Sequence, residues 1–96
     1  MAEVFANIVT DHDNFEFGGP GTIQFTSDQG GRLTMLAKCP GCGEASALPL
    51  YPWEGRSRWQ HWEFDGNRER PTLSPSVHHA DGCGWHGYLR NGVWRD

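Results

Sequence analysis

The sequence has little positive charge and only one lysine, Lys38. Its 96 residues hold 12 Asp and Glu against 8 Lys and Arg, which gives a formal net charge of −4. Proteins that bind the phosphate backbone usually carry a basic surface, so this balance disfavours nucleic acid as a partner. Four arginines alternate with acidic residues, which indicates a solvated face of mixed charge: Arg56, Arg58, Arg68 and Arg70.

Long apolar runs are also missing. A membrane-spanning helix needs about 20 consecutive apolar residues, and no segment approaches that length. The N-terminal stretch MAEVFANIVT lacks the basic and apolar regions of a secretion signal, and Ala2 stands where N-myristoylation requires glycine. We therefore expect no membrane contact and a location in the cytosol.

The signals for α-helices are poor throughout the chain. No window of about a dozen residues keeps apolar residues at positions i, i+3 and i+4 without Gly or Pro. The Asn91-Gly92 pair predicts a type I′ turn within a hairpin over residues 87–95. Other short β-rich stretches cover residues 22–26, 32–37, 45–50 and 58–64. We predict one mostly β domain over residues 1–96, with five to seven short antiparallel strands, an aromatic core and at most a short helix near the middle.

Cysteines are few, and their number argues against disulfides. Three cysteines cannot all pair within one chain, and cytosolic thiols are kept reduced. A redox role for Cys39-Pro40-Gly41-Cys42 would need a helix after the pair, but the segment GEASALPLYP is a poor helix former. Pro40 fixes its own φ and Gly41 tolerates unusual backbone angles, so the stretch suits a tight metal-binding turn.

A second pair of candidate ligands, Cys83 and His86, completes the set. The spacing is C-x2-C-x40-C-x2-H, which uses all three cysteines. Three thiolates and one imidazole suit tetrahedral Zn²⁺ in a closed, structural site. We therefore predict one structural Zn²⁺ in a zinc-ribbon-like domain, with His79 or His78 as alternatives for the fourth ligand. The predicted ligands are Cys39, Cys42, Cys83 and His86.

The segment PTLSPS (residues 71–76) is the other unusual passage. Its hydroxyl residues Thr72, Ser74 and Ser76 alternate, and two histidines follow shortly after. Prolines within a strand indicate a sheet edge or a bulge, so one interpretation is a purely structural edge strand. The other is a nucleophilic serine with a histidine base, although no G-x-S-x-G motif is present.

Three motifs occur in order between Leu33 and Trp94: CPGCG…LPL, W-x-F-D-G-N…PTLSPSV and CGWHGYLRNG. Together they resemble a family of small zinc-ribbon-like proteins of unknown function, common in phages and prophages and often mislabelled "ammonia monooxygenase". The resemblance supports the same four metal ligands and implies a phage origin. Relatives of that family appear beside bacterial ubiquitin-like conjugation genes, which implies a peptidase role that would fall on Ser74 or Ser76.

Two functions of different classes follow. A closed metal site, acidic charge and Gly/Pro-rich loops favour a phage-encoded accessory protein that binds another protein without catalysis. Its partner would be a host factor or a virion component, and it would lie in the host cytoplasm or in the phage particle. The alternative is a small serine peptidase or amidohydrolase that uses the PTLSPS segment.

Overall fold

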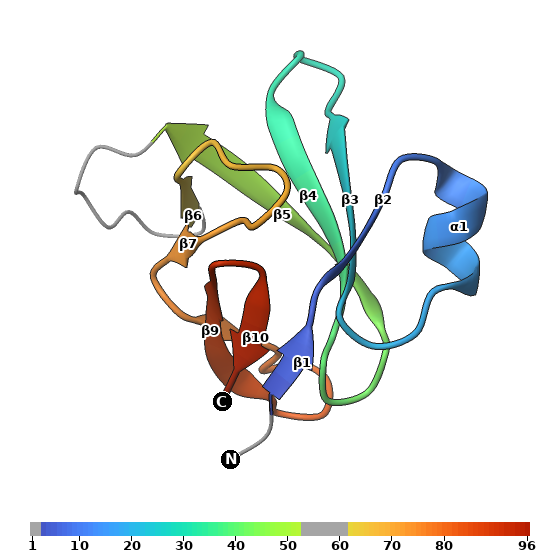
Figure 1. The fold of residues 1–96 in the computed structure, drawn as a ribbon, viewed down its shortest axis with the longest axis vertical. Coiled ribbons are helices and arrows are strands. Elements are labelled where there is room, and N and C mark those ends of the chain that lie inside the picture. The colour runs from blue at the N-terminus through green and yellow to red at the C-terminus, as the bar shows by residue number, and fades with distance from the viewer. Residues whose placement is uncertain (1–2, 53–61) are drawn as a thin grey trace.

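The computed structural model describes residues 3–52 and 62–96 (Figure 1). These residues form ten short strands and one short helix. In chain order the elements are β1 (Glu3–Phe5), β2 (Asn7–Val9), α1 (His12–Phe17), β3 (Thr22–Ser27), β4 (Leu33–Lys38), β5 (Ala45–Pro52), β6 (Trp62–Phe64), β7 (Leu73–Ser74), β8 (Val77–His78), β9 (His86–Arg90) and β10 (Val93–Arg95). The predicted mostly β, zinc-ribbon-like fold class is confirmed, but the chain has more strands than the five to seven expected.

The strands form two sheets. One has four strands in the order β1-β10-β9-β8, and the other has six in the order β2-β3-β4-β5-β6-β7. Most neighbours run antiparallel, as predicted, while β2 with β3 and β5 with β6 are parallel pairs. The segment that leaves the edge of the larger sheet at β7 enters the edge of the smaller sheet at β8, so it joins the two sheets.

The hydrophobic core takes side chains from both sheets. Ile23 and Met35 come from the six-stranded sheet, Leu89 and Trp94 come from the four-stranded sheet, and all four are almost fully buried. The indole N–H of Trp94 donates to the backbone carbonyl of Gly21 at 3.1 Å, which satisfies its buried donor. The core is aromatic only in part: Trp94, on β10, and Phe64, on β6, are its buried aromatic members, and the other buried members of the cluster are not aromatic.

The N-terminal segment holds the elements that the sequence did not reveal. Helix α1 lies near the N-terminus instead of the middle, and it connects the parallel strands β2 and β3. It begins after Asp11, whose carboxylate accepts a hydrogen bond from the backbone N–H of Asn14 at 2.8 Å. Phe15 is its only buried residue, so this helix has no apolar stripe for a periodicity argument to detect.

The C-terminal hairpin has the predicted turn. Asn91 and Gly92 have φ angles of 51° and 76°, as a type I′ turn requires. The turn also holds the PTLSPS segment in place. The backbone N–H of Asn91 donates to the Thr72 hydroxyl at 2.8 Å, and the N–H of Gly92 donates to the Pro71 carbonyl at 2.9 Å.

Two further expectations meet the structure only in part. Within residues 3–52 and 62–96, no helix has the length and apolarity needed to cross a membrane. The mixed-charge face and the strand predicted over residues 58–64 lie partly outside the described residues, which exclude Arg56 and Arg58. The described part of that strand is β6.

Candidate active site and metal-binding cluster

The Cys39–Gly43 turn follows directly after β4. The N–H of Gly43 donates to the Cys39 carbonyl at 2.7 Å, and the N–H of Cys39 donates to the Glu44 carbonyl at 2.8 Å. Gly43 has a φ of 78°, which glycine adopts without strain. The N–H of Gly41 also points at the Cys39 sulfur, 3.4 Å away. The turn therefore presents both cysteine side chains from a fixed backbone, as the sequence predicted.

The loop between β8 and β9 supplies the other side of the cluster. The N–H of His79 donates to the Trp85 carbonyl at 2.8 Å and closes the loop at its base. The His79 carbonyl accepts from the N–H groups of Gly82 and Gly84, at 3.2 and 3.0 Å. These bonds fold the loop back on itself and bring Cys83 beside His79.

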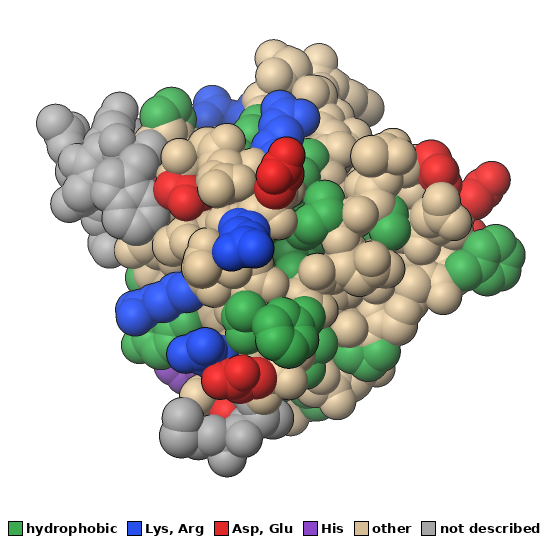
Figure 2. Space-filling view, in the orientation of Figure 1, with side chains coloured by type: hydrophobic (Ala, Val, Ile, Leu, Met, Phe, Trp, Pro, Cys, Tyr) green, Lys and Arg blue, Asp and Glu red, His purple; other side chains and the backbone are tan. Residues whose placement is uncertain are grey.

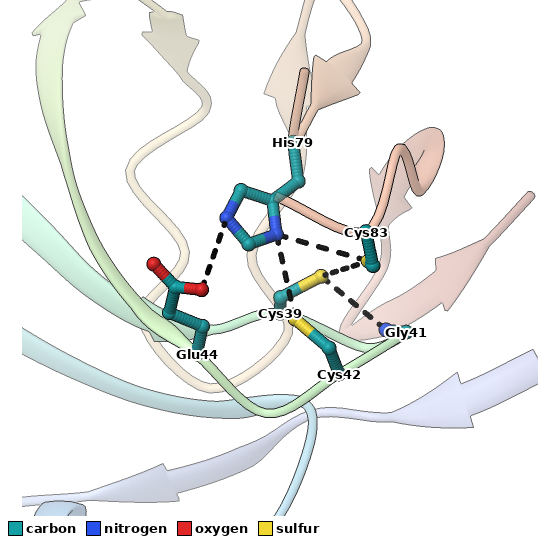
Figure 3. Close-up of polar contacts among 6 residues, drawn as sticks. All are labelled: Cys39, Gly41, Cys42, Glu44, His79 and Cys83. Atoms are coloured by element: carbon teal, nitrogen blue, oxygen red, sulfur yellow. Dashed lines mark hydrogen bonds and ion pairs between the residues drawn. The ribbon is translucent and has the colours of Figure 1, made fainter. Parts of the chain in front are cut away.

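Three cysteines and one histidine converge at this point (Figure 3). The Cys39 and Cys83 sulfurs are 3.6 Å apart, and Nδ1 of His79 lies 3.5 Å from the Cys42 sulfur and 3.8 Å from the Cys83 sulfur. Tetrahedral ligands at about 2.3 Å for sulfur and about 2.0–2.1 Å for nitrogen lie about 3.5–3.8 Å from one another. The cluster therefore has the chemistry and the spacing of a four-ligand metal site.

The fourth member of the cluster is His79, which the sequence offered as an alternative. His86, the residue that the spacing favoured, contacts Ser76 instead. The reason is the register of the β8–β9 hairpin, because His86 already belongs to β9 while His79 begins the loop that carries Cys83. His78, the other alternative, pairs with His86 across the hairpin.

The imidazole of His79 also has a partner on its far side. Its Nε2 lies 3.9 Å from a carboxylate oxygen of Glu44, while Nδ1 faces the sulfurs (Figure 3). A carboxylate at this position favours the tautomer that carries its proton on Nε2, which leaves Nδ1 free to bind a metal. Glu44 was not identified from the sequence, although it follows the Cys39–Gly43 turn directly.

The cysteine thiols differ in acidity. Burial raises the pKa of the Cys39 thiol above its ordinary value. The pKa of Cys83 is lowered to about 7, chiefly by the backbone N–H of Trp85 and then by the contact with His79. Because metals bind thiolates, binding at this cluster must release protons, and acid must weaken it.

A second constellation lies on the strands next to the loop. The Ser76 hydroxyl oxygen is 2.7 Å from Nε2 of His86. The register explains this contact: His78 pairs with His86, and Ser76 stands two residues before His78, so its side chain leaves the same face diagonally opposite His86. A serine hydroxyl hydrogen-bonded to an imidazole is the arrangement of an activated nucleophile with its base.

The surroundings hold this pair in place. The rings of His78 and His86 are 4.8 Å apart between centroids, with an interplanar angle of 34°. The indole N–H of Trp62 donates to the Ser76 carbonyl at 3.2 Å. Ser74, the other candidate nucleophile, pairs with Glu63 in the six-stranded sheet. The structure therefore brings Ser76 to a histidine, while within residues 3–52 and 62–96 it places no histidine in contact with the Ser74 hydroxyl.

Comparison with known proteins assigns the family. A family model described as bacterial ubiquitination-like system serine protease (BubE) matches residues 9–96. No curated protein and no solved structure matches the chain.

Two expectations from the sequence are therefore wrong. The matching family is not the phage family of unknown function, and its description as a serine protease contradicts an accessory protein that acts only by binding. The closed metal site misled the functional interpretation, because the sequence does not show that Ser76 lies beside His86. The match spans nearly the whole chain, and the protein belongs to the BubE family of bacterial ubiquitination-like system serine proteases.

Proposed function

We propose that this protein is a serine protease in which Ser76 is the nucleophile and His86 is the general base. The observation that carries the proposal is the 2.7 Å contact between the Ser76 hydroxyl and Nε2 of His86. The family description supports the reaction class, and the diagonal position of the two residues across a hairpin supports their roles. Both residues are accessible, since His86 is exposed and Ser76 is half-buried.

Ser76 and His86 can carry out acyl transfer in two steps, acylation of the serine and hydrolysis of the ester. Nε2 of His86 accepts the Ser76 hydroxyl proton while the oxygen attacks the carbonyl carbon of the scissile bond. The imidazolium then returns that proton to the departing amine, which leaves an acyl ester on Ser76. Water, deprotonated by the same nitrogen, hydrolyses the ester and restores the serine. His78 packs against the His86 ring, so it restricts the directions in which that ring can turn.

We propose further that the cluster binds one structural Zn²⁺. Its ligand atoms all lie within 4.8 Å of one another, and three thiolates with one imidazole are a donor set that zinc favours. Four protein ligands fill a tetrahedron, so the ion would hold the β8–β9 loop against the Cys39–Gly43 turn. The reacting groups would remain Ser76 and His86.

The proposed nucleophile is tested with a fluorophosphonate probe, which forms a covalent bond with activated serines. We expect the parent protein and Ser74→Ala to be labelled, and Ser76→Ala to lose labelling without losing its metal or its fold. Mass spectrometry of the labelled peptide should place the probe on Ser76. An unlabelled parent protein, or equal labelling of Ser76→Ala, would contradict the proposal.

A further inference from the structure

The four-stranded sheet has one covered face and one exposed face, and the reactive pair lies on the exposed face. Along β9, Gly87 and Leu89 are buried while the alternate residues His86, Tyr88 and Arg90 are exposed. Val77 pairs with Gly87, so the same register continued by one residue places Ser76 opposite Tyr88. Besides His78 and His86, the large side chain nearest to Ser76 along this face is therefore that of Tyr88.

The exposed face continues across β10 and β1. Tyr88 pairs with Arg95 and Arg90 pairs with Val93, while Phe5 on β1 pairs with Val93. We call the surface formed by Phe5, Tyr88, Arg90, Val93 and Arg95 the docking face. Figure 2 views the molecule from this side and shows hydrophobic and basic side chains over β1, β9 and β10, with acidic side chain atoms beside them and histidine visible at the margin.

The docking face exposes large apolar side chains. Three large hydrophobic residues are exposed in the described part of the chain: Phe5 at 75%, Tyr88 at 44% and Phe17 at 89%. Two of the three belong to the docking face: Tyr88 lies on β9, the strand next to Ser76, and Phe5 lies on β1, at the far edge of the sheet. Exposed aromatic side chains gathered beside a site indicate a contact surface, because they supply a large apolar area with little rotamer freedom to lose.

Glu3 lies on the same face opposite Arg95, so two arginines and one glutamate give this face a net positive charge, opposite in sign to that of the whole chain. The Arg90 guanidinium lies 4.6 Å from the centre of the Tyr88 ring, and Arg95 forms an ion pair of 3.3 Å with Glu3. Among the residues that the structure describes, no carboxylate lies within ion-pair distance of the Arg90 guanidinium. A chain with a net charge of −4 thus presents the Arg90 cation, which lies over the ring of Tyr88, on the strand next to Ser76.

We propose that the docking face binds an acidic segment of the peptide substrate; this inference rests on the proposed protease function. Arg90 stands one strand across from Ser76 and two residues further along β9. With a strand spacing of about 4.8 Å and a rise of about 3.4 Å per residue, the two Cα atoms are about 8 Å apart. An extended peptide covers that distance in about two to three residues. The preferred substrate therefore has Asp or Glu two to three residues from the scissile bond, on one side only.

The test is cleavage of a defined pool of synthetic peptides, with the products identified by mass spectrometry. We expect Asp and Glu to be enriched at that position. Arg90→Glu should abolish the enrichment and lower kcat/KM on the best acidic peptide at least tenfold, mainly through KM. The rate at which the small fluorophosphonate probe labels Ser76 should stay unchanged, because that probe does not reach the docking face.

The chain offers two matched controls away from this face. Arg32 also holds its guanidinium over a tyrosine, 4.3 Å from the ring of Tyr51, so Arg32→Glu changes the same charge in the same setting. Phe17→Ala removes an exposed phenyl ring as Phe5→Ala does. Only the docking-face variants should raise KM.

Each remaining outcome has a definite meaning. A pool cleaved without acidic enrichment, or an equal effect of Arg32→Glu, overturns the docking face. A parent protein that labels at Ser76 but cleaves no peptide overturns it as well, while the nucleophile stands. A parent protein that does not label at Ser76 overturns the proposed function, and the docking face falls with it.

Discussion

The metal-binding cluster and the Ser76–His86 pair share one β-hairpin, the cluster at its loop and the pair across its strands, but they are built differently. The cluster joins side chains that are 37 to 44 residues apart in sequence, and its backbone is held by several hydrogen bonds. The pair joins residues only ten apart, across two short strands. β8 has two residues, too few to hold its own register, so we expect the Ser76–His86 contact to depend on the loop that carries His79 and Cys83.

Removal of the metal should have the largest effect, because it tests that dependence directly. Zinc contributes an apparent binding free energy of about 10–16 kcal/mol in small zinc-binding peptides, which is comparable to the whole stability of a domain. A strong chelator should therefore unfold the protein and abolish labelling of Ser76. Circular dichroism, labelling and metal analysis are followed in parallel, and metal analysis should find one zinc per chain. Full labelling of metal-free protein would show that the Ser76–His86 contact does not depend on the cluster.

Replacing His79 and His86 one at a time should separate the role of the metal-binding cluster from the role of the Ser76–His86 pair. His79→Asn should lower metal affinity and, through the loop, labelling. His86→Asn should retain the metal and the fold, and it should slow labelling by about 10²–10⁴-fold, the usual contribution of a general base. Metal content and labelling rate are measured on both variants. Loss of metal from His86→Asn would instead identify His86 as the fourth metal ligand, as the C-x2-H spacing favoured.

A methyl group added at Gly41 should have a smaller effect, on the stability of the fold and on metal binding by the cluster. A Cβ at this position would lie 2.9 Å from the Trp85 Cβ and 3.0 Å from the Cys83 sulfur. Gly41→Ala should therefore cost about 1–3 kcal/mol of stability, the usual cost of overpacking, and weaken metal binding. Gly19→Ala is the matched control, since a Cβ there meets nothing within 4 Å. Denaturant unfolding compares the two variants.

Removal of the Glu44 charge should have the smallest effect. Partners that orient a metal-binding histidine contribute about 10–100-fold to affinity, but this carboxylate is exposed and 3.9 Å from Nε2 of His79. We expect Glu44→Gln to lower metal affinity by less than about tenfold and to leave the labelling rate unchanged. Competition with a chromogenic chelator measures the affinity, and Glu16→Gln, on α1, serves as a control for a lost exposed charge.

The sequence predicted the parts of the molecule whose geometry is local. Asn91-Gly92 specifies its turn through positive φ angles, and the Cys39–Gly43 turn is closed by its own backbone and two glycines. Strands β3, β4 and β5 are long enough for β-rich composition to mark them. Strands β1 and β2 have three residues each, so their existence depends on partners distant in sequence.

The position of His79 in the cluster and the contact between Ser76 and His86 depend on the register of a hairpin. The C-x2-H spacing treats Cys83 and His86 as one unit, while the structure divides them between a loop and a strand. A shift of one residue turns a strand side chain to the opposite face, so composition alone could not decide whether His86 pointed to the metal or to Ser76.

The sequence separation within the cluster also sets an order of events during synthesis. Cys39 and Cys42 leave the ribosome well before Cys83, 44 residues after Cys39, so the cluster cannot close on the early segment alone. His86 follows three residues later. The proposed nucleophile, Ser76, would therefore acquire its base and its closed hairpin at nearly the same moment, so an unfinished chain that ends before His86 would be inactive as a protease.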